Sequence, residues 1–259
     1  MGGRRKRGKG RWWICLVLLL GVAWFFYASW RPFSEKESFA EVEYLPSDEG
    51  ELVRHTYYSL SFNSEHKQAN WVYYVLALQG QKKRAERTDN FREDRKVTSG
   101  SAKPSDYTHS GYDRGHLCPA GDMAQSELAM QETFFMSNIA PQVPQFNRGI
   151  WKKLEERVRD WARREPICIA TGPVFKDSKG KIGKSGVTVP GYFYKVLYAP
   201  VHQRMIAFLL PNSPDKRPLQ EYVVTVDSVE CLTNIDFFPQ LADTLETRLE
   251  AMADYAVWN

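Results

Sequence analysis

The stretch RGIWKKLEERVRDWARR, residues 148–164, carries the strongest periodic signal in the chain and decides the fold class. Apolar residues recur in it at steps of three and four, and lysine and arginine occupy the opposite face. This period predicts an amphipathic helix with one face in a core, ended by Pro166. The apolar positions are Ile150, Trp151, Leu154, Val158 and Trp161.

Runs rich in tyrosine, valine and leucine lie on both sides of this helix in the chain and predict strands. The predicted strands cover residues 57–62, 71–78, 167–170, 192–198 and 205–210. Shorter helices are expected at 123–132, 217–224, 228–233 and 241–256, and a long exposed connection at 79–98. This order predicts an α+β domain with a mixed or antiparallel sheet flanked by helices.

Three segments precede this domain, which the sequence places at residues 52–259. Residues 1–11 are a basic tail with six positive charges, 12–30 are 19 uncharged and mostly apolar residues, and 31–51 form an acidic linker. Nineteen helical residues are long enough to cross a bilayer core, so residues 12–30 predict a transmembrane anchor. The basic tail predicts a cytoplasmic N-terminus and an extracytoplasmic domain, on the periplasmic or extracellular side.

A cleaved signal peptide is the alternative to this anchor. Ala28 and Ser29 are small enough for a cleavage site, but Trp30 departs from the small-residue pattern. The apolar stretch is also longer than a usual signal core. We therefore favour an uncleaved anchor.

The net charge of +4 comes from the N-terminal tail. Without its six positive charges the rest of the chain carries −2, so the pI near 8.8 says nothing about the folded part. Nucleic-acid binding would need a local basic cleft. The hydrophobic share of 43% and charged share of 25% are typical of a globular domain with a complete core.

The cysteines leave the redox state open. Cys15 lies in the apolar segment, and Cys118, Cys168 and Cys231 are an odd number for an oxidising compartment. One disulfide with a free thiol and three buried thiols are both compatible with the sequence.

Three motifs carry candidate chemistry. They are D-R-G-H at residues 113–116, S-N-I-A-P-Q at 137–142, and N-R-G-I-W followed by L-E at 147–155. A four-residue match alone would be weak evidence, but the ordered set resembles the DNA/RNA non-specific endonucleases of the ββα-metal superfamily. The resemblance extends over about residues 57–249. It implies a ββα-metal unit formed by the strands around His116 and the helix after Asn147.

The resemblance implies a role for each motif residue. His116 is the expected general base, and Asn147 the expected direct protein ligand of Mg²⁺. Glu155 is expected to reach metal-bound water, Arg114 to contact the phosphate, and Asn138 to orient the site. These residues would make the chain a metal-dependent nuclease without sequence preference, whose products have 5′-phosphate ends.

The residue types suit this chemistry. Histidine titrates near neutrality, so a neutral His116 can take a proton from water. Mg²⁺ keeps several waters, so the single amide oxygen of Asn147 is a workable ligand for it, for Mn²⁺ or for another divalent cation. The plainer alternatives are a core or surface histidine, an Asn147 that only caps a helix starting at Arg148, and a Glu155 that is one exposed helix glutamate among several.

Arginines are the expected phosphate ligands, because a guanidinium binds phosphate through two hydrogen bonds and keeps its charge. In the resembling family a second arginine often contributes, upstream of the Asn-Phe-Arg stretch at 90–92. Arg87 is the best candidate, with Arg84 and Arg92 as alternatives. Asp113 is expected to be a structural hydrogen-bond acceptor rather than a metal ligand.

Two other sites are disfavoured. His116 and Cys118 with Cys168 could suggest zinc, but no C-x-x-C or H-x₃-H spacing supports it. A catalytic Cys118 lacks any supporting motif.

The predicted function is hydrolysis of phosphodiester bonds in DNA and RNA, which are recognised through their backbone phosphates. The alternative from another class is a membrane-anchored, non-catalytic nucleic-acid-binding protein. A degenerate enzyme would be expected to lose His116 or Asn147, and both are present. A hydrolase for a different phosphodiester is a third hypothesis. The sequence leaves the oligomeric state open, and a homodimer is one possibility.

Overall fold

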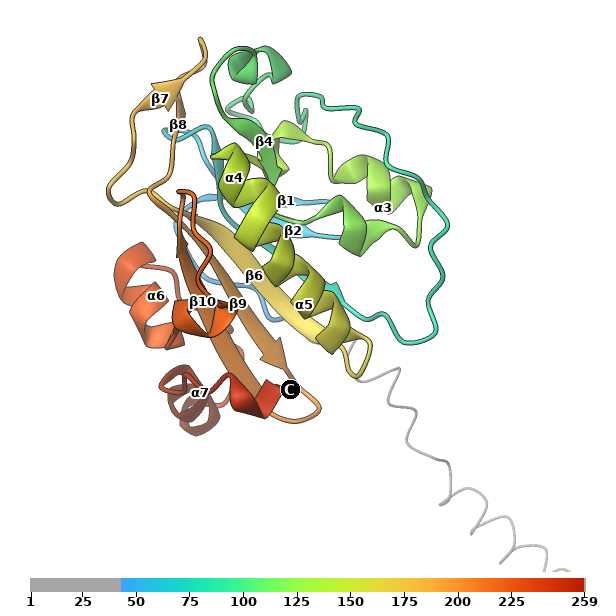
Figure 1. Ribbon diagram of the computed structural model, residues 1–259, viewed down its shortest axis with the longest axis vertical. Coiled ribbons are helices and arrows are strands. Elements are labelled where there is room, and N and C mark those ends of the chain that lie inside the picture. The colour runs from blue at the N-terminus through green and yellow to red at the C-terminus, as the bar shows by residue number, and fades with distance from the viewer. Residues whose placement is uncertain (1–42, 259) are drawn as a thin grey trace, which may run out of the picture. The chain divides into compact units, whose positions relative to one another are not determined.

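A seven-stranded sheet organises the structure, a computed structural model that describes residues 43–258 (Figure 1). Its order is β1-β2-β3-β6-β9-β10-β11, and every neighbouring pair is antiparallel. The strands are β1 Glu51–Arg54, β2 Ser59–Asn63, β3 Gln68–Leu76, β6 Ile167–Val174, β9 Tyr192–Ala199, β10 Arg204–Pro211 and β11 Val223–Val224. The predicted α+β class is confirmed, and this main sheet is antiparallel rather than mixed.

The two faces of this sheet build two separate apolar clusters. Alternate strand residues point to opposite faces, so Ile167 and Ile169 of β6 join one cluster while Cys168 and Ala170 join the other. Helix α5, Lys152–Ala162, packs on the first face. Helices α6, Val226–Thr233, and α7, Asp243–Glu250, pack on the second face (Figure 1).

The helix predicted over 148–164 starts earlier and is interrupted. Helix α4, Pro144–Phe146, has proline at its first turn, where the fixed φ of proline suits a helix. A π-helical turn, Asn147–Trp151, follows, in which Gly149 leaves the helical region at φ −105° and ψ −107°. Helix α5 then continues to Ala162 and buries Leu154, Val158 and Trp161 as predicted.

A small hairpin-like pair of strands lies beside this helix. Strand β4, Asp113–His116, pairs with β5, Ile139–Gln142, in an antiparallel register. Between them lie a 3₁₀ turn, Ala120–Met123, the helix α3, Glu127–Glu132, capped by Ser126, and a 3₁₀ turn, Met136–Asn138. The remaining elements are β7 Lys181–Ile182, β8 Val187–Thr188 and the 3₁₀ turns Pro104–Tyr107, Leu219–Tyr222 and Ala256–Trp258.

Two segments predicted to be extended connections are tied to the fold. The connection 79–98 is mostly exposed, but Asp94 is buried and Arg92 forms a β-bridge with Phe135. At the end of the predicted linker 31–51, Tyr44 packs edge-on against Tyr198 with ring centroids 5.4 Å apart. The folded unit therefore begins at Tyr44 rather than at residue 52.

The predicted basic tail 1–11 and anchor 12–30 lie outside the described residues. Within residues 43–258, no helix is both long enough and apolar enough to cross a membrane. The anchor therefore stays a prediction.

Candidate active site

The glycine of the D-R-G-H motif lets β4 and β5 lie close together. A Cβ at Gly115 would come within 2.2 Å of the Gln142 side chain, which is fully buried. The close pairing places Asp113 opposite Gln142, where β5 ends and the chain turns into α4. Strand β4 and the π turn are thereby brought to one cleft.

Asn147 is held in one orientation by Asp113. Its Nδ2 donates a hydrogen bond of 2.9 Å to Asp113 Oδ2. A carboxylate can only accept, so this contact fixes which end of the amide faces Asp113 and leaves Oδ1 on the other side. The backbone N–H of Asn147 donates to Val143 O at 2.9 Å, inside the helical segment. The alternative that Asn147 caps a helix starting at Arg148 is therefore wrong, because the helix starts at Pro144.

Asp113 is the acceptor for a second partner. Arg148 donates from Nε to Asp113 Oδ2 at 2.8 Å and from its terminal nitrogen to Oδ1 at 2.6 Å. Both carboxylate oxygens are thus engaged by donors, which matches the expected structural role of Asp113. The Arg148 side chain is itself 72% exposed, and Arg148 lines the cleft.

The cleft has a volume of about 410 Å³ and is rich in arginine and aromatic side chains. The lining residues are Arg87, Phe91, Tyr107, Tyr112, Asp113, Arg114, Asn147 and Arg148. Three arginines around one carboxylate give the local positive charge that the whole-chain composition could not show.

Arg114 and Arg87 are held at this cleft by different contacts. The Arg114 guanidinium lies 5.3 Å from the Phe91 ring centroid and donates to Pro104 O at 2.9 Å. Arg87 lies 5.3 Å from the Phe134 ring and pairs with Asp89 at 2.7 Å on the surface.

The two alternatives to Arg87 do not line the cleft. Arg92 stacks on Phe135 at 4.1 Å from the ring centroid. The backbone N–H of Arg84 donates to Ala124 O. Of the three upstream candidates, only Arg87 is placed at the cleft.

His116 is buried between two aromatic rings. Its ring centroid lies 5.1 Å from that of Phe134 and 5.6 Å from that of Phe91, and 8% of its surface is exposed. Burial, with a smaller contribution from Arg87, lowers the pKa of His116 to about 3, so the imidazole is neutral at neutral pH. Its buried Nε2 has no hydrogen-bond partner among the described residues. His116 does not itself line the cleft, but Arg87 and Phe91 beside it do.

Asn138 contacts backbone rather than the cleft. Its Oδ1 accepts from Cys118 N at 2.8 Å, and its Nδ2 donates to Cys118 O and Thr133 O, each at 2.9 Å. The side chain is fully buried. Asn138 therefore fixes the chain that follows His116 and acts as a positioning residue.

Glu155 lies on α5 near the charged residues Asp122, Arg159 and Lys195. It is only partly exposed, so the alternative of an ordinary exposed helix glutamate is wrong. Burial and the negative charge of Asp122 raise its pKa, while Lys195 and Arg159 lower it. Arg159 pairs with Asp122 at 2.8 Å. Lys195 of β9 is 1% exposed, and its Nζ has no hydrogen-bond partner in the described part of the chain. Glu155 does not line the cleft of Asn147.

The family model described as DNA/RNA non-specific endonuclease matches residues 35–244. The chain belongs to this family. A nuclease from Nostoc sp. is 36% identical over 212 residues, which are 76% of this chain and 76% of that protein. Mitochondrial endonuclease G of Bos taurus is 34% identical over 202 residues, 71% of this chain and 68% of its own.

Solved structures support the same relationship for this member of the endonuclease family. A chain in the crystal structure of the EndoG/EndoGI complex is 30% identical, with a TM-score of 0.67, and the match covers 75% of this chain and 88% of that chain. The chain is therefore a hydrolytic nuclease with the α+β fold of its relatives.

The donor set of this family member fits a weakly held divalent cation. Asn147 offers one neutral oxygen to the cleft, whereas both oxygens of Asp113 already accept hydrogen bonds. A cation that keeps most of its waters, such as Mg²⁺, suits one protein oxygen. Among residues 43–258, neither His116 nor Cys118 belongs to a group with metal-ligand spacing, which argues against the zinc site.

None of the three cysteines within residues 43–258 lines the cleft. Cys118 and Cys168 are buried, Cys231 is exposed, and all three are unpaired; Cys15 lies outside the described residues. The sequence left open one disulfide or three buried thiols. The structure has three free thiols among the described residues, of which two are buried and Cys231 is exposed. Burial raises the pKa of the Cys118 thiol, which argues against a nucleophile.

Sequence reasoning missed Arg148 and Lys195. Arg148 sits inside a quoted motif, and its signal was its position next to the candidate ligand. Lys195 had a visible signal too, since it is a lysine in the otherwise uncharged strand 192–199.

Proposed function

We propose that this chain is a metal-dependent endonuclease that hydrolyses phosphodiester bonds of DNA and RNA without sequence preference. The observation that carries the proposal is the cleft in which Asp113 orients the Asn147 amide beside Arg87, Arg114 and Arg148. The neutral Asn147 oxygen can hold a cation, and the arginines beside it can bind phosphate oxygens. This combination suits a phosphodiester better than an uncharged substrate.

Each residue has a chemical task in this proposal. Neutral His116 accepts the proton of the attacking water, since its lowered pKa keeps its lone pair available. Arg114, with Arg87, binds the phosphate and stabilises the negative charge that grows on it. Asn147 would hold a divalent cation, Mg²⁺ or Mn²⁺, which supplies a Lewis acid for the phosphate and the leaving 3′ oxygen when bound.

Two further residues act at a distance from the cleft. Glu155 would orient water bound to that cation, and its ionisation depends on Lys195 beside it. Asn138 keeps the chain after His116 in place through its three backbone hydrogen bonds. Products with 5′-phosphate ends follow if the 3′ oxygen leaves.

The proposal extends to where the protein works. Residues 12–30 would anchor it in a membrane with the domain on the extracytoplasmic side, and a homodimer is compatible with it. The membrane-anchored, non-catalytic binding protein is the second hypothesis. His116 and Asn147, which a degenerate enzyme would be expected to lose, are both present, so the enzyme is favoured.

The test uses the full chain, purified in detergent, with plasmid DNA and with a folded RNA as substrates. Both should be degraded in Mg²⁺, and excess EDTA should abolish the activity because one amide oxygen binds the cation weakly. Undiminished cleavage in EDTA refutes the metal dependence. Tight binding of both nucleic acids without any hydrolysis in Mg²⁺ or Mn²⁺ would favour the binding protein instead.

A further inference from the structure

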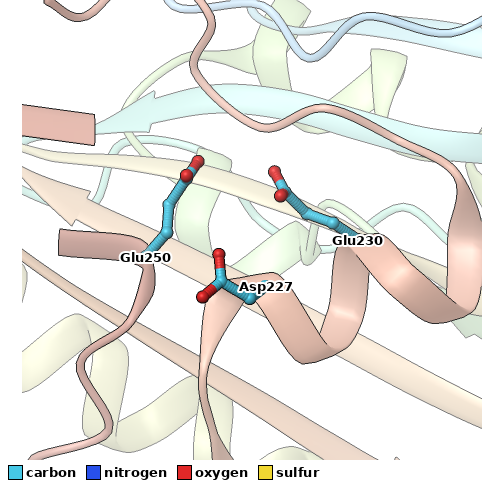
Figure 2. A group of neighbouring side chains, drawn as sticks. All are labelled: Asp227, Glu230 and Glu250. Carbon is cyan, nitrogen blue, oxygen red and sulfur yellow. The ribbon is translucent and has the colours of Figure 1, made fainter. Parts of the chain in front are cut away.

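Five carboxylates gather on the sheet face opposite α5. Asp227 and Glu230 belong to α6, Asp236 follows that helix, and Glu246 and Glu250 belong to α7. They form two overlapping groups that share Glu250, and in each group one oxygen per residue lies within 4.8 Å of the others. Figure 2 shows Asp227, Glu230 and Glu250, drawn from the two helices toward one another.

A buried oxygen without a donor distinguishes this group from an ordinary acidic surface. Glu250 is 8% exposed, and its Oε1 is buried and has no hydrogen-bond partner among the described residues. Glu246 Oε1 is in the same condition. A buried carboxylate oxygen that loses water and gains no donor is strongly unfavourable, so something else is expected to contact it.

No side-chain cation in the described part of the chain supplies that contact. Within residues 43–258, none of the five carboxylates lies within 4.0 Å of a lysine, arginine or histidine nitrogen. Glu230 accepts one backbone hydrogen bond, from Phe237 N at 2.8 Å. Burial and mutual repulsion raise the pKa of Glu230, of Glu246 and of Glu250, the last to about 8.

We propose that these carboxylates bind a Ca²⁺ ion between α6 and α7. Ca²⁺ takes six to eight oxygen ligands and accepts carboxylates in one- or two-oxygen contact, so a group of three acids that contains Glu250 could hold it together with water. The group contains no nitrogen or sulfur donor, so it does not favour zinc or copper.

The ion would have a structural role, because the site is remote from the nuclease cleft. Helices α6 and α7 pack on the apolar cluster of one sheet face, whereas α5 and the π turn pack on that of the other. Both helices have eight residues, and an ion between them would join two short elements that bury little surface alone. This inference stands independently of the nuclease mechanism.

A proton is the competing occupant. A protonated Glu250 can donate to Glu230, and a hydrogen bond from Glu250 lowers the pKa of Glu230. That arrangement still leaves Glu250 Oε1 without a partner. The two occupants predict different responses to Ca²⁺.

The experiment uses the full chain in detergent with Asn147→Ala, so that the catalytic site does not contribute. Ca²⁺ binding is measured by equilibrium dialysis with CaCl₂, and the melting temperature by tryptophan fluorescence. We expect one saturable site. At 100 times its Kd, Ca²⁺ should raise the melting temperature by about 5 °C, since a ligand that binds only the folded state stabilises it.

Variants decide whether the bound ion is at this site. Adding Glu250→Gln, or separately Glu246→Gln, should weaken Ca²⁺ binding at least tenfold and remove the thermal shift. Asp243→Asn is the matched control, because it removes a carboxylate from α7 outside the five and should leave binding unchanged. Absence of saturable binding, or binding that survives both glutamine variants, overturns the proposal. A higher melting temperature of Glu250→Gln without any response of the parent to Ca²⁺ would identify a shared proton and overturn it too.

Discussion

At the scale of single residues, the orientation of Asn147 is the feature on which the cleft depends. Asp113 accepts from its amide nitrogen and also from Arg148, so one carboxylate orients the Asn147 oxygen while Arg148 holds that carboxylate. Sequence motifs indicated the identities of Asn147, His116 and Arg114. They could not show that Asp113 orients the amide, because that contact joins two segments 34 residues apart.

Asp113→Ala should loosen this orientation. The Mg²⁺ concentration for half-maximal plasmid cleavage is expected to rise about 10- to 100-fold, as for other partners that orient metal ligands. Activity at saturating Mg²⁺ should largely return. Arg148→Ala is the control, since it removes the other partner of Asp113 and keeps the Asn147 contact. An unchanged Mg²⁺ dependence of Asp113→Ala would show that the amide needs no support.

The pH dependence of cleavage follows from the burial of His116. Its pKa is lowered to about 3, so the neutral base persists on acidification well below the ordinary value of 6.5. In a profile of kcat/KM at saturating Mg²⁺, the acid limb should therefore have its midpoint below about 5. Protonation of His116 would remove activity only beneath that midpoint. A limb centred at 6.5 or above would contradict the buried environment described here.

At the scale of elements, the sequence predicted five of the seven strands of the main sheet and the buried face of α5. It missed β1, and the helix predicted at 217–224 is a 3₁₀ turn followed by β11. Leu154, Val158 and Trp161 are buried because the helical period places them on one side. The period could not show the π turn at Asn147–Trp151, which depends on the local backbone at Gly149. It also missed the charged group under α5, since Glu155 faces Lys195 only after β9 packs there.

Lys195→Met should separate catalysis from stability. Glu155 is partly exposed and its pKa is already raised, so without Lys195 it takes up a proton instead of remaining charged. The melting temperature should change by only a few degrees, while cleavage at neutral pH falls and partly recovers at higher pH. Lys152→Met, an exposed change on α5, is the control. A loss of activity that pH does not alter would show that Lys195 is only structural.

At the scale of the whole molecule, the sheet separates a basic cleft on one side from an acidic group on the other. The net charge of the chain hides this division, because the N-terminal tail outweighs the rest. Composition could therefore predict neither surface. The order of strands and helices predicted the α+β class, since a helix with one apolar face must pack on another element and the chain around it is rich in strands.

The anchor prediction belongs to this scale. Full-length protein should stay in the membrane fraction after a high-salt wash, because 19 uncharged residues follow a basic tail. Removal of the residues before Arg31 should release it. Membrane retention is read by immunoblot of the two fractions. A mature protein whose first residue lies near Trp30, determined by N-terminal sequencing, would show that a signal peptidase cuts here.

The most direct test of the central claim compares His116→Ala with Asn147→Ala on plasmid DNA and on RNA. If His116 activates water, its loss should lower turnover on the order of 10²–10⁴-fold at every Mg²⁺ concentration, with nucleic-acid binding nearly intact. Asn147→Ala should also lose turnover, but high Mg²⁺ should partly restore it, because the defect lies in cation occupancy. Equal activity of the parent and His116→Ala on both substrates would contradict the mechanism.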